Sequence, residues 1–323
     1  MSRSIGDLGE FVLIGQVTTR LPQGSEIILG PGDDAAVISA PDRRVVATTD
    51  LLIENRHFRR EWSSAYDIGR KAAAQNLADV AAMGGRPTAL LVGLAAPPQL
   101  AVAWVLDCTD GLRDECEVVG ASVAGGDISA GEMITLGITA LGSLEGRAPV
   151  TRAGARPGDV VVLAGRLGWA AAGLALLRRA GAGADAIPGD LAPLVAAHRR
   201  PEPPYALGPA LALAGATAMC DVSDGLVQDL GHIATASGVA VELSRPALTP
   251  PPALAAAAAA LGVDPWSWVL GGGDDHALVA CLPPTATAPN GCRVIGRVGE
   301  RGDAAVLVDG EPWEGAGGHE HFR

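Results

Sequence analysis

The feature that most constrains this chain is a set of six short acidic segments spread along its length. They are "GPGDDAAV" (30–37), "TTD" (48–50), "NLAD" (76–79), "AGGD" (124–127), "DVSDG" (221–225) and "GGGDD" (271–275). Glycine and aspartate are common in surface turns, so a solvated turn explains any one segment. Their recurrence in both halves of the chain indicates that the fold uses these carboxylates for a shared purpose.

Charge and cysteine content narrow the class of protein. The formal net charge is −12 at pH 7 and there is no basic run, which excludes nucleic acid and an anionic membrane as partners. The five cysteines form no C-x-x-C pair and do not suggest a disulfide framework. The longest apolar run, 253–261, is too short to span a bilayer, and the first residues lack the apolar stretch of a signal peptide. We therefore expect a reduced protein with a cytoplasmic location.

The length of 323 residues predicts two domains. Segment 146–159, rich in Gly, Pro and Arg, marks the boundary, which gives domains of 1–148 and 149–323. The pattern predicts an α+β or mixed α/β fold. The expected strands are 45–50, 88–94, 132–144 and 160–164, the expected helices are 64–84, 98–120 and 168–181, and a strand followed by a helix is expected around 217–237, with a hairpin over 304–313.

The helix predicted over 64–84 carries one of the acidic segments. Ser64 and Asp67 have the spacing of a capping box, and Gly84-Gly85 ends the helix. Asn76 and Asp79 are three residues apart and share a face.

Oxygen-rich turns favour a hard cation. Mg²⁺ takes oxygen ligands and is commonly held by a few carboxylates together with substrate phosphates. The six histidines have no zinc-type spacing. Because the only lysine, Lys71, is followed by alanine, there is no P-loop, and no G-x-G-x-x-G is present. If the protein handles polyphosphate, Mg²⁺ must neutralise most of the charge.

The segment "DVSDGLVQDLGHI" (221–233) is the most informative. A strand leads into a helix, and Asp224 has the position of an N-cap, where free N–H groups also favour an anion. A simple cap explains Asp224 but leaves Asp221 unexplained. That excess carboxylate indicates a functional site.

The ordered motifs together resemble the thiamine-monophosphate kinase family. They are "GPGDDAA", "TTDLL…RHF", "RKAAAQNLADVAAMGG", "AGGDIS", "TRAGARPGD", "DVSDGLVQDLGHI" and "GGGDDHAL", and the resemblance extends from 9–11 to 319–322. It implies a two-domain PurM-like architecture that binds ATP with Mg²⁺ and lacks a P-loop. It also implies a homodimer whose N-terminal domains pair through their sheets, with the C-terminal α/β domain completing the nucleotide and substrate site.

The resemblance also assigns residues. Those matching metal-binding positions are Asp34, Thr48, Thr49, Asp50, Asp79, Asp127, Asp221 and Asp224, of which Asp34, Asp127 and Asp224 are the expected catalytic set. Those matching nucleotide-contacting positions are Gly126, Asp127, Arg152 and Ser223. His57, Asp274 and His319 match the thiamine phosphate pocket. Asp33 belongs to the same acidic turn as Asp34.

Two departures from the family pattern fall in the expected substrate pocket. Where the family commonly has Gly-Gly-Glu-Asp-Tyr-Glu-Leu, residues 272–278 are Gly-Gly-Asp-Asp-His-Ala-Leu. This shortens one acid and removes an aromatic residue and a second acid. His319 stands where an aromatic residue is frequent.

The leading hypothesis is ATP-dependent phosphorylation of thiamine phosphate to thiamine diphosphate by direct in-line attack. Two alternatives stay open: another ATP-using member of the superfamily, such as a carrier-type maturation protein or a purine-pathway synthetase, and an acidic cation-binding protein without activity. His57 also fits an ordinary half-buried histidine, and Arg152 a solvated loop residue. Asp67, Asp107, Asp110 and Asp114 are expected to be solvated helix charges.

Overall fold

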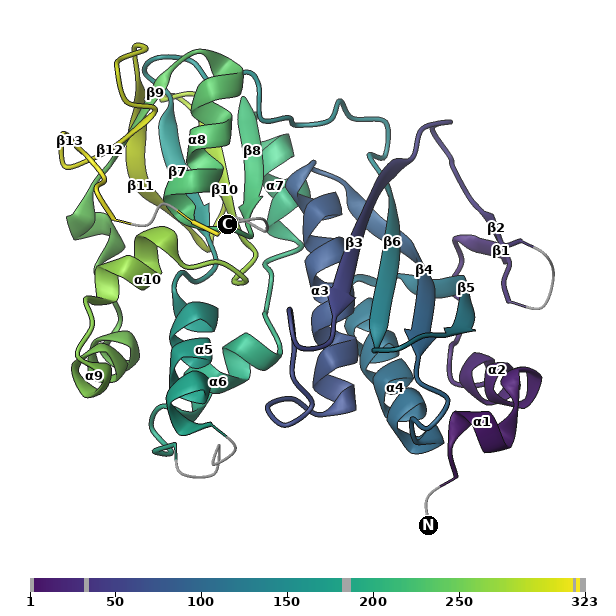
Figure 1. Ribbon diagram of the computed structural model, residues 1–323. Coiled ribbons are helices and arrows are strands. Elements are labelled where there is room, and N and C mark those ends of the chain that lie inside the picture. The colour runs from purple at the N-terminus through teal and green to yellow at the C-terminus, as the bar shows by residue number, and fades with distance from the viewer. Residues whose placement is uncertain (1–2, 32–34, 182–186, 316–317, 320–323) are drawn as a thin grey trace. The chain divides into compact units, whose positions relative to one another are not determined.

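The computed structural model describes residues 3–31, 35–181, 187–315 and 318–319. The chain divides into two compact units. Unit 1 comprises Met1–Val80 and Gly85–Arg147, and unit 2 comprises Ala81–Gly84 and Ala148–Arg323 (Figure 1). Asp33 and Asp34 lie outside the described residues.

Unit 1 is built on a four-stranded sheet. Its strand order is β3-β6-β4-β5, and only β4 and β5 are parallel. The strands are β3 (Val46–Ile53), β4 (Arg86–Ala96), β5 (Ser122–Ala130) and β6 (Thr135–Ser143), and a separate hairpin pairs β1 (Ile27–Leu29) with β2 (Val37–Ile38). The helices are α1 (Ile5–Leu8), α2 (Glu10–Thr18), α3 (Ala65–Ala82) and α4 (Val102–Val119).

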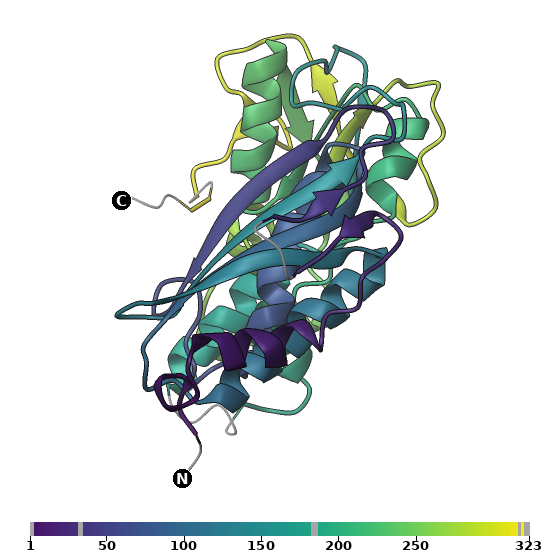
Figure 2. The ribbon, with the colours of Figure 1, turned by 90° about the vertical axis from the view of Figure 1, so that its right-hand side faces the viewer.

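Helices α3 and α4 cover one face of this sheet, as Figures 1 and 2 show. They approach closely because each has a glycine at their contact. A Cβ on Gly69 would collide with the Cys108 carbonyl oxygen, and one on Gly111 would collide with the Tyr66 carbonyl oxygen. The other sheet face is more open, since Ala47, Thr49 and Leu51 of β3 are exposed.

Unit 2 contains a seven-stranded sheet of order β13-β12-β9-β11-β7-β10-β8, antiparallel except for the β12/β9 pair. Its strands are β7 (Val160–Ala164), β8 (Ala218–Val222), β9 (Ala240–Leu243), β10 (Ala277–Leu282), β11 (Cys292–Gly299), β12 (Val306–Val308) and β13 (Glu311–Pro312). Its helices are α5 (Trp169–Ala180), α6 (Ala192–Arg199), α7 (Leu207–Leu213), α8 (Leu226–Ser237), α9 (Pro252–Leu261) and α10 (Pro265–Gly271), with a 3₁₀ turn η2 (Arg245–Leu248). Strand β10 lies inside the sheet and is buried along its whole length.

The predicted elements are present, with shifted ends. The capping box forms at α3, where Ser64 and Asp67 exchange hydrogen bonds of 3.1 and 3.3 Å. Helix α4 begins at Val102 rather than residue 98, because Pro97 and Pro98 precede it and residues 97–100 form a turn. The hairpin of β12 and β13 turns at Asp309-Gly310, both with positive φ as a tight hairpin turn requires.

No helix among the described residues is long and apolar enough to cross a membrane. All five cysteines are free thiols, and four of them are buried.

Candidate active site

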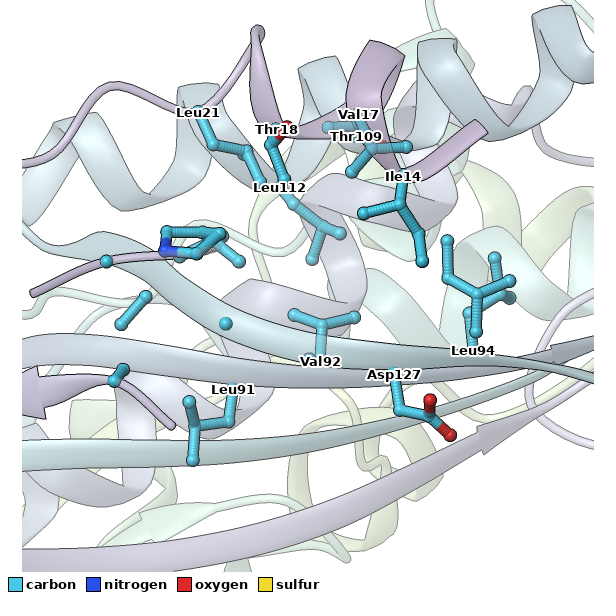
Figure 3. Close-up of a pocket in the computed structure, with 18 of the residues that line it drawn as sticks. Ile14, Val17, Thr18, Leu21, Leu91, Val92, Leu94, Thr109, Leu112 and Asp127 are labelled. Atoms are coloured by element: carbon cyan, nitrogen blue, oxygen red, sulfur yellow. The ribbon is translucent and has the colours of Figure 1, made fainter. Parts of the chain in front are cut away.

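A large apolar pocket lies in unit 1 between α2, α4 and the sheet. Its volume is about 880 Å³, which is within the usual range for small-molecule sites. Figure 3 shows Ile14 and Val17 of α2, Leu112 of α4 and Val92 of β4 directed toward one another. Gly126 and Asp127 belong to its lining at the sheet. Among the described residues that line it, the pocket thus combines an apolar interior with one carboxylate.

Strand β5 carries Gly126 and Asp127 along the edge of the sheet. A Cβ on Gly126 would collide with the Val92 carbonyl oxygen, so the close pairing of β5 with β4 requires glycine here. Asp127 is exposed. An exposed carboxylate beside an apolar pocket suits a ligand with an apolar ring and a tail that is cationic or carries a bound metal ion.

A second group of predicted residues lies at the other edge of the sheet. The Thr48 hydroxyl of β3 donates a 2.7 Å hydrogen bond to Asp79 of α3. Asp50 lies two residues further on and therefore shares the face of Thr48. Thr49 points to the opposite face, where its hydroxyl donates to the Ile138 carbonyl at 2.9 Å.

The sheet order separates these two groups. Strands β3 and β5 are the two edge strands, three strand spacings apart, or about 14 Å. Asp127 therefore does not lie beside Thr48 and Asp50 within unit 1. In the described part of the chain, no group of three or more His, Cys, Asp or Glu side chains could by itself hold a metal ion.

His57 is half-buried in the turn after β3. Its Nδ1 accepts the Ile53 N–H at 3.0 Å, so in the neutral ring the proton is on Nε2.

In unit 2, three segments that are far apart in sequence meet. The Asp274 N–H donates to the Ser223 carbonyl at 2.8 Å, and the His319 N–H donates to the Asp224 carbonyl at 3.1 Å. A Cβ on Gly273 would collide with the Ser223 carbonyl oxygen, which explains the glycine before Asp274. The structure therefore brings together four of the residues expected in one site.

The loop after β8 is held by a carboxylate that the sequence did not single out. Asp229 of α8 accepts the N–H groups of Asp224 and Gly225 at 3.1 and 3.0 Å. The prediction that Asp224 caps this helix is wrong, because Gly225, with a φ of 146°, is the N-cap and no side chain caps it. Burial raises the pKa of Asp229 to about 7. The hydrogen bonds from the two N–H groups lower the pKa and so offset part of this increase.

The loop before β10 has a similar internal support. Asp274 and His276 both have positive φ, of 65° and 49°, which is a strained conformation for residues other than glycine. Between them, buried Asp275 accepts the Gly168 and Ala170 N–H groups at 2.5 and 2.9 Å, at the start of α5. Burial raises the pKa of Asp275 to about 7.

Asp221 and His276 form a buried pair beneath these loops, with 3.0 Å between the Asp221 carboxylate and the His276 Nδ1. The histidine that departs from the family pattern thus contacts one of the expected metal-binding aspartates. Arg152 lies in the segment beside β8. The preceding residue, Thr151, accepts the Met219 N–H at its carbonyl at 3.0 Å. The Arg152 carbonyl accepts a hydrogen bond from the Ser237 hydroxyl.

Comparison with known proteins defines the class. Residues 32–144 match the family model of the AIR synthase related protein N-terminal domain, and residues 156–309 match that of its C-terminal domain. The chain is 48% identical to the thiamine-monophosphate kinase of Mycobacterium tuberculosis, over 99% of this chain and 94% of that protein. It belongs to the thiamine-monophosphate kinase family, which is a family of enzymes.

Solved structures of relatives support the same family assignment. The crystal structure of thiamine-monophosphate kinase from Stenotrophomonas maltophilia is 34% identical, with a TM-score of 0.80 over 94% of this chain and 97% of that one. The structure of AaThiL complexed with AMPPCP and TMP is 33% identical, with a TM-score of 0.79 over 99% of this chain and 100% of that one. The PurM-like, two-domain mixed α/β fold expected from the sequence is confirmed.

Proposed function

We propose that this enzyme transfers the γ-phosphoryl group of ATP to thiamine phosphate, giving thiamine diphosphate and ADP. The observation that carries the proposal is the meeting of Ser223, Asp224, Asp274 and His319 in unit 2, since residues chosen by family resemblance alone converge there. Support also comes from the relatives, which are named for this activity, and from the AaThiL structure with an ATP analogue and TMP.

The apolar pocket of unit 1 would hold the base of ATP. Its walls present aliphatic side chains from α2, α4 and β4 to both faces of a flat ring. Gly126 allows β5 to pair closely with β4 at the pocket wall, and exposed Asp127 beside it would lie near the charged part of the nucleotide. Burial of the ring would supply the affinity, and the charged tail would fix its direction.

The residues expected to hold Mg²⁺ have the chemistry for it. They offer carboxylate and hydroxyl oxygens, and in two places these are already paired or supported: Thr48 with Asp79, and Asp221 with His276. Mg²⁺ commonly takes only one or two carboxylates and obtains its other ligands from phosphates and water. Asp34, Thr48, Thr49, Asp50, Asp79, Asp127, Asp221 and Asp224 stay the proposed ligands. When bound, Mg²⁺ would neutralise phosphate charge in the transition state.

The chain's own residues would mainly position the two substrates. The acceptor is a phosphate oxygen that is already anionic at neutral pH, so in-line attack on the γ-phosphorus needs no strong general base. The bond from the γ-phosphorus to the bridging oxygen breaks as the new bond to the acceptor oxygen forms. Ser223 and Arg152 would contact the nucleotide, while Asp274, His57 and His319 would bind the thiamine part. Catalysis would thus come from positioning and electrostatics.

We also propose that the enzyme is a cytoplasmic homodimer formed through the sheets of unit 1. Leu51 of β3 is 58% exposed on the more open sheet face, beside exposed Ala47 and Thr49. An uncovered sheet of this kind is a liability in a monomer. Light scattering should give twice the chain mass at micromolar concentration, and Leu51→Glu should shift the equilibrium toward monomer. A monomeric wild type would refute the dimer.

The activity is tested by incubation with ATP, Mg²⁺ and thiamine phosphate, with thiamine diphosphate and ADP both quantified. Equal amounts of the two products support the proposal. ATP hydrolysis without thiamine diphosphate would favour another ATP-using member of the superfamily. No reaction, together with binding of Mg²⁺, would favour a cation-binding protein.

A further inference from the structure

Helix α2 forms one wall of the unit 1 pocket but is weakly anchored by apolar contacts. Of its nine residues only Leu13 is buried, whereas Phe11 is 85% and Val12 is 53% exposed. Ile14 and Val17 face the pocket and therefore gain full burial only when a ligand fills it. Its position must depend on the contacts at its two ends.

At the N-terminal end, backbone bonds fix the chain. The N–H groups of Ile5 and Gly6 donate to the carbonyls of Leu100 and Pro98, each at 2.8 Å. These bonds attach α1, and through it the start of α2, to the loop before α4.

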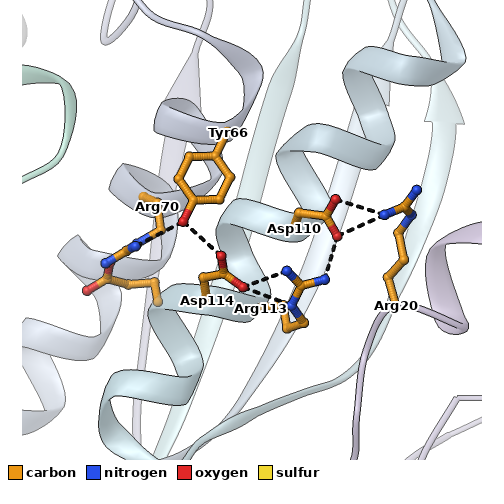
Figure 4. A network of polar contacts seen from close by, with 7 residues as sticks. Arg20, Tyr66, Arg70, Asp110, Arg113 and Asp114 are labelled. Carbon is orange, nitrogen blue, oxygen red and sulfur yellow. Dashed lines mark hydrogen bonds and ion pairs between the residues drawn. The ribbon is translucent and has the colours of Figure 1, made fainter.

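At the C-terminal end, the first anchor is an ion pair. Arg20, two residues after α2, places Nη1 3.0 and 2.8 Å from the two carboxylate oxygens of Asp110 on α4 (Figure 4). Asp110 directly follows Thr109, which lines the pocket. The pair therefore connects the α2 wall to the α4 wall. Gln23 then donates to the Val123 carbonyl of β5 at 3.1 Å.

Further contacts hold Asp110 in place, so the prediction that Asp110 and Asp114 are simply solvated is wrong. Arg113 donates to Asp110 at 2.6 Å and to Asp114 at 2.6 and 2.8 Å. The Tyr66 hydroxyl of α3 donates to Asp114 at 2.8 Å and accepts from Arg70, which also pairs with buried Glu115. Figure 4 shows this chain of contacts from Arg20 toward α3. Because Arg113 holds Oδ1 of Asp110 and is itself held by Asp114, Asp110 offers Arg20 a pre-organised partner.

We infer that the Arg20–Asp110 pair positions α2 as a wall of the nucleotide-base pocket and so sets the affinity for ATP. Arg20 and Asp110 are positioning residues, since they are not themselves in the pocket lining. The inference rests on the proposed function, in which this pocket takes the base. Without this pair, α2 would sample wider separations from α4. Ligand binding would then have to bring α2 back toward α4, which would weaken the observed affinity.

The test compares Arg20→Ala, Arg20→Lys and Asp110→Asn with wild type and with a control. Arg44→Ala is the matched control, because Arg44 forms an ion pair of similar exposure with Asp42 in the same unit, outside the pocket lining. Dissociation constants for Mg²⁺·AMPPCP are measured by calorimetry. KM for ATP, KM for thiamine phosphate and kcat follow from steady-state kinetics, and the ligand-free melting temperature reports folding.

We expect Arg20→Ala and Asp110→Asn to weaken AMPPCP binding and raise KM for ATP by about two- to fivefold, the range for loss of a partly exposed ion pair. Arg20→Lys should recover part of the loss, while kcat and KM for thiamine phosphate stay within about twofold of wild type in all variants. Arg44→Ala should bind AMPPCP like wild type.

Three results would overturn the inference: unchanged AMPPCP binding in both variants, an equal rise in both KM values, or the same loss in the Arg44→Ala control. If Arg20→Ala fails to fold, the graded comparison of Arg20→Lys and Asp110→Asn decides by the same criteria. Failure of the wild type to bind AMPPCP would instead contradict the proposed function itself.

Discussion

The two regions that carry the predicted site are built in opposite ways. The pocket of unit 1 is lined mostly by aliphatic side chains on helices and strands, and it obtains its shape from packing. Ser223, Asp224 and Asp274 of unit 2 lie on the loops after β8 and before β10, and they obtain their positions from backbone hydrogen bonds and buried carboxylates. This difference is the basis of a proposed division of labour, in which the unit 1 pocket would bind a ring by burial and the unit 2 loops would hold polar groups in a fixed geometry.

The largest expected effect is at Asp127. Asp127→Asn keeps the side-chain shape but removes the charge beside the pocket, so turnover should fall about 100-fold or more, as for loss of a group that acts on the transition state. The metal-free protein should be as stable as wild type or slightly more so, because one of several acidic side chains is removed. A melting series with EDTA, Mg²⁺ alone and Mg²⁺·AMPPCP checks this. A mutant that keeps both its turnover and its nucleotide-dependent rise in melting temperature would show that Asp127 has no role in catalysis or nucleotide binding.

A substitution at Asp275 tests the role of the unit 2 loops. Asp275→Asn leaves at least one of the two N–H groups at the start of α5 without its carboxylate acceptor and should lower the free energy of unfolding by about 1–2 kcal/mol. The strained loop would loosen with it, so KM for thiamine phosphate should rise several-fold while AMPPCP binding is kept. Chemical denaturation and isothermal calorimetry measure the two effects. Asp67→Asn, in the exposed capping box of α3, is the control for general loss of a capping carboxylate.

A smaller effect is expected in the pH dependence of stability. The folded pKa values of Asp229 and Asp275, about 7, lie above the ordinary 3.8. The folded state therefore binds protons more tightly between these values, so the contribution of each group to the free energy of unfolding falls as pH rises from about 4 to 7 and is constant above that. Urea unfolding of wild type and of Asp275→Asn across this range should show a shallower decline in the mutant. Parallel curves would mean that Asp275 is ionised throughout.

The sequence predicted local features well and long-range ones poorly. Strand β7 begins and ends where expected, and the α3 capping box forms because its two partners are three residues apart. The helix-cap prediction for Asp224 was wrong because Gly225 is the N-cap and Asp229 accepts the N–H groups of the loop, which only the folded chain reveals. The contact of Arg20 with Asp110 joins residues 90 positions apart, and neither residue belongs to a motif. The site residues came from the family resemblance, whereas the walls of the pocket came from the packing of α2 on α4.

The division of labour is tested most directly by measuring the binding of each substrate to two variants. Val17→Trp places an indole in the unit 1 pocket, and Asp274→Ala removes a carboxylate from the unit 2 loops. Calorimetry gives the dissociation constants of Mg²⁺·AMPPCP and of thiamine phosphate for each. We predict that Val17→Trp weakens AMPPCP at least about tenfold and leaves thiamine phosphate unchanged, while Asp274→Ala does the reverse. If either variant weakened both ligands by the same factor, the two regions would not have separate roles and the account would be wrong.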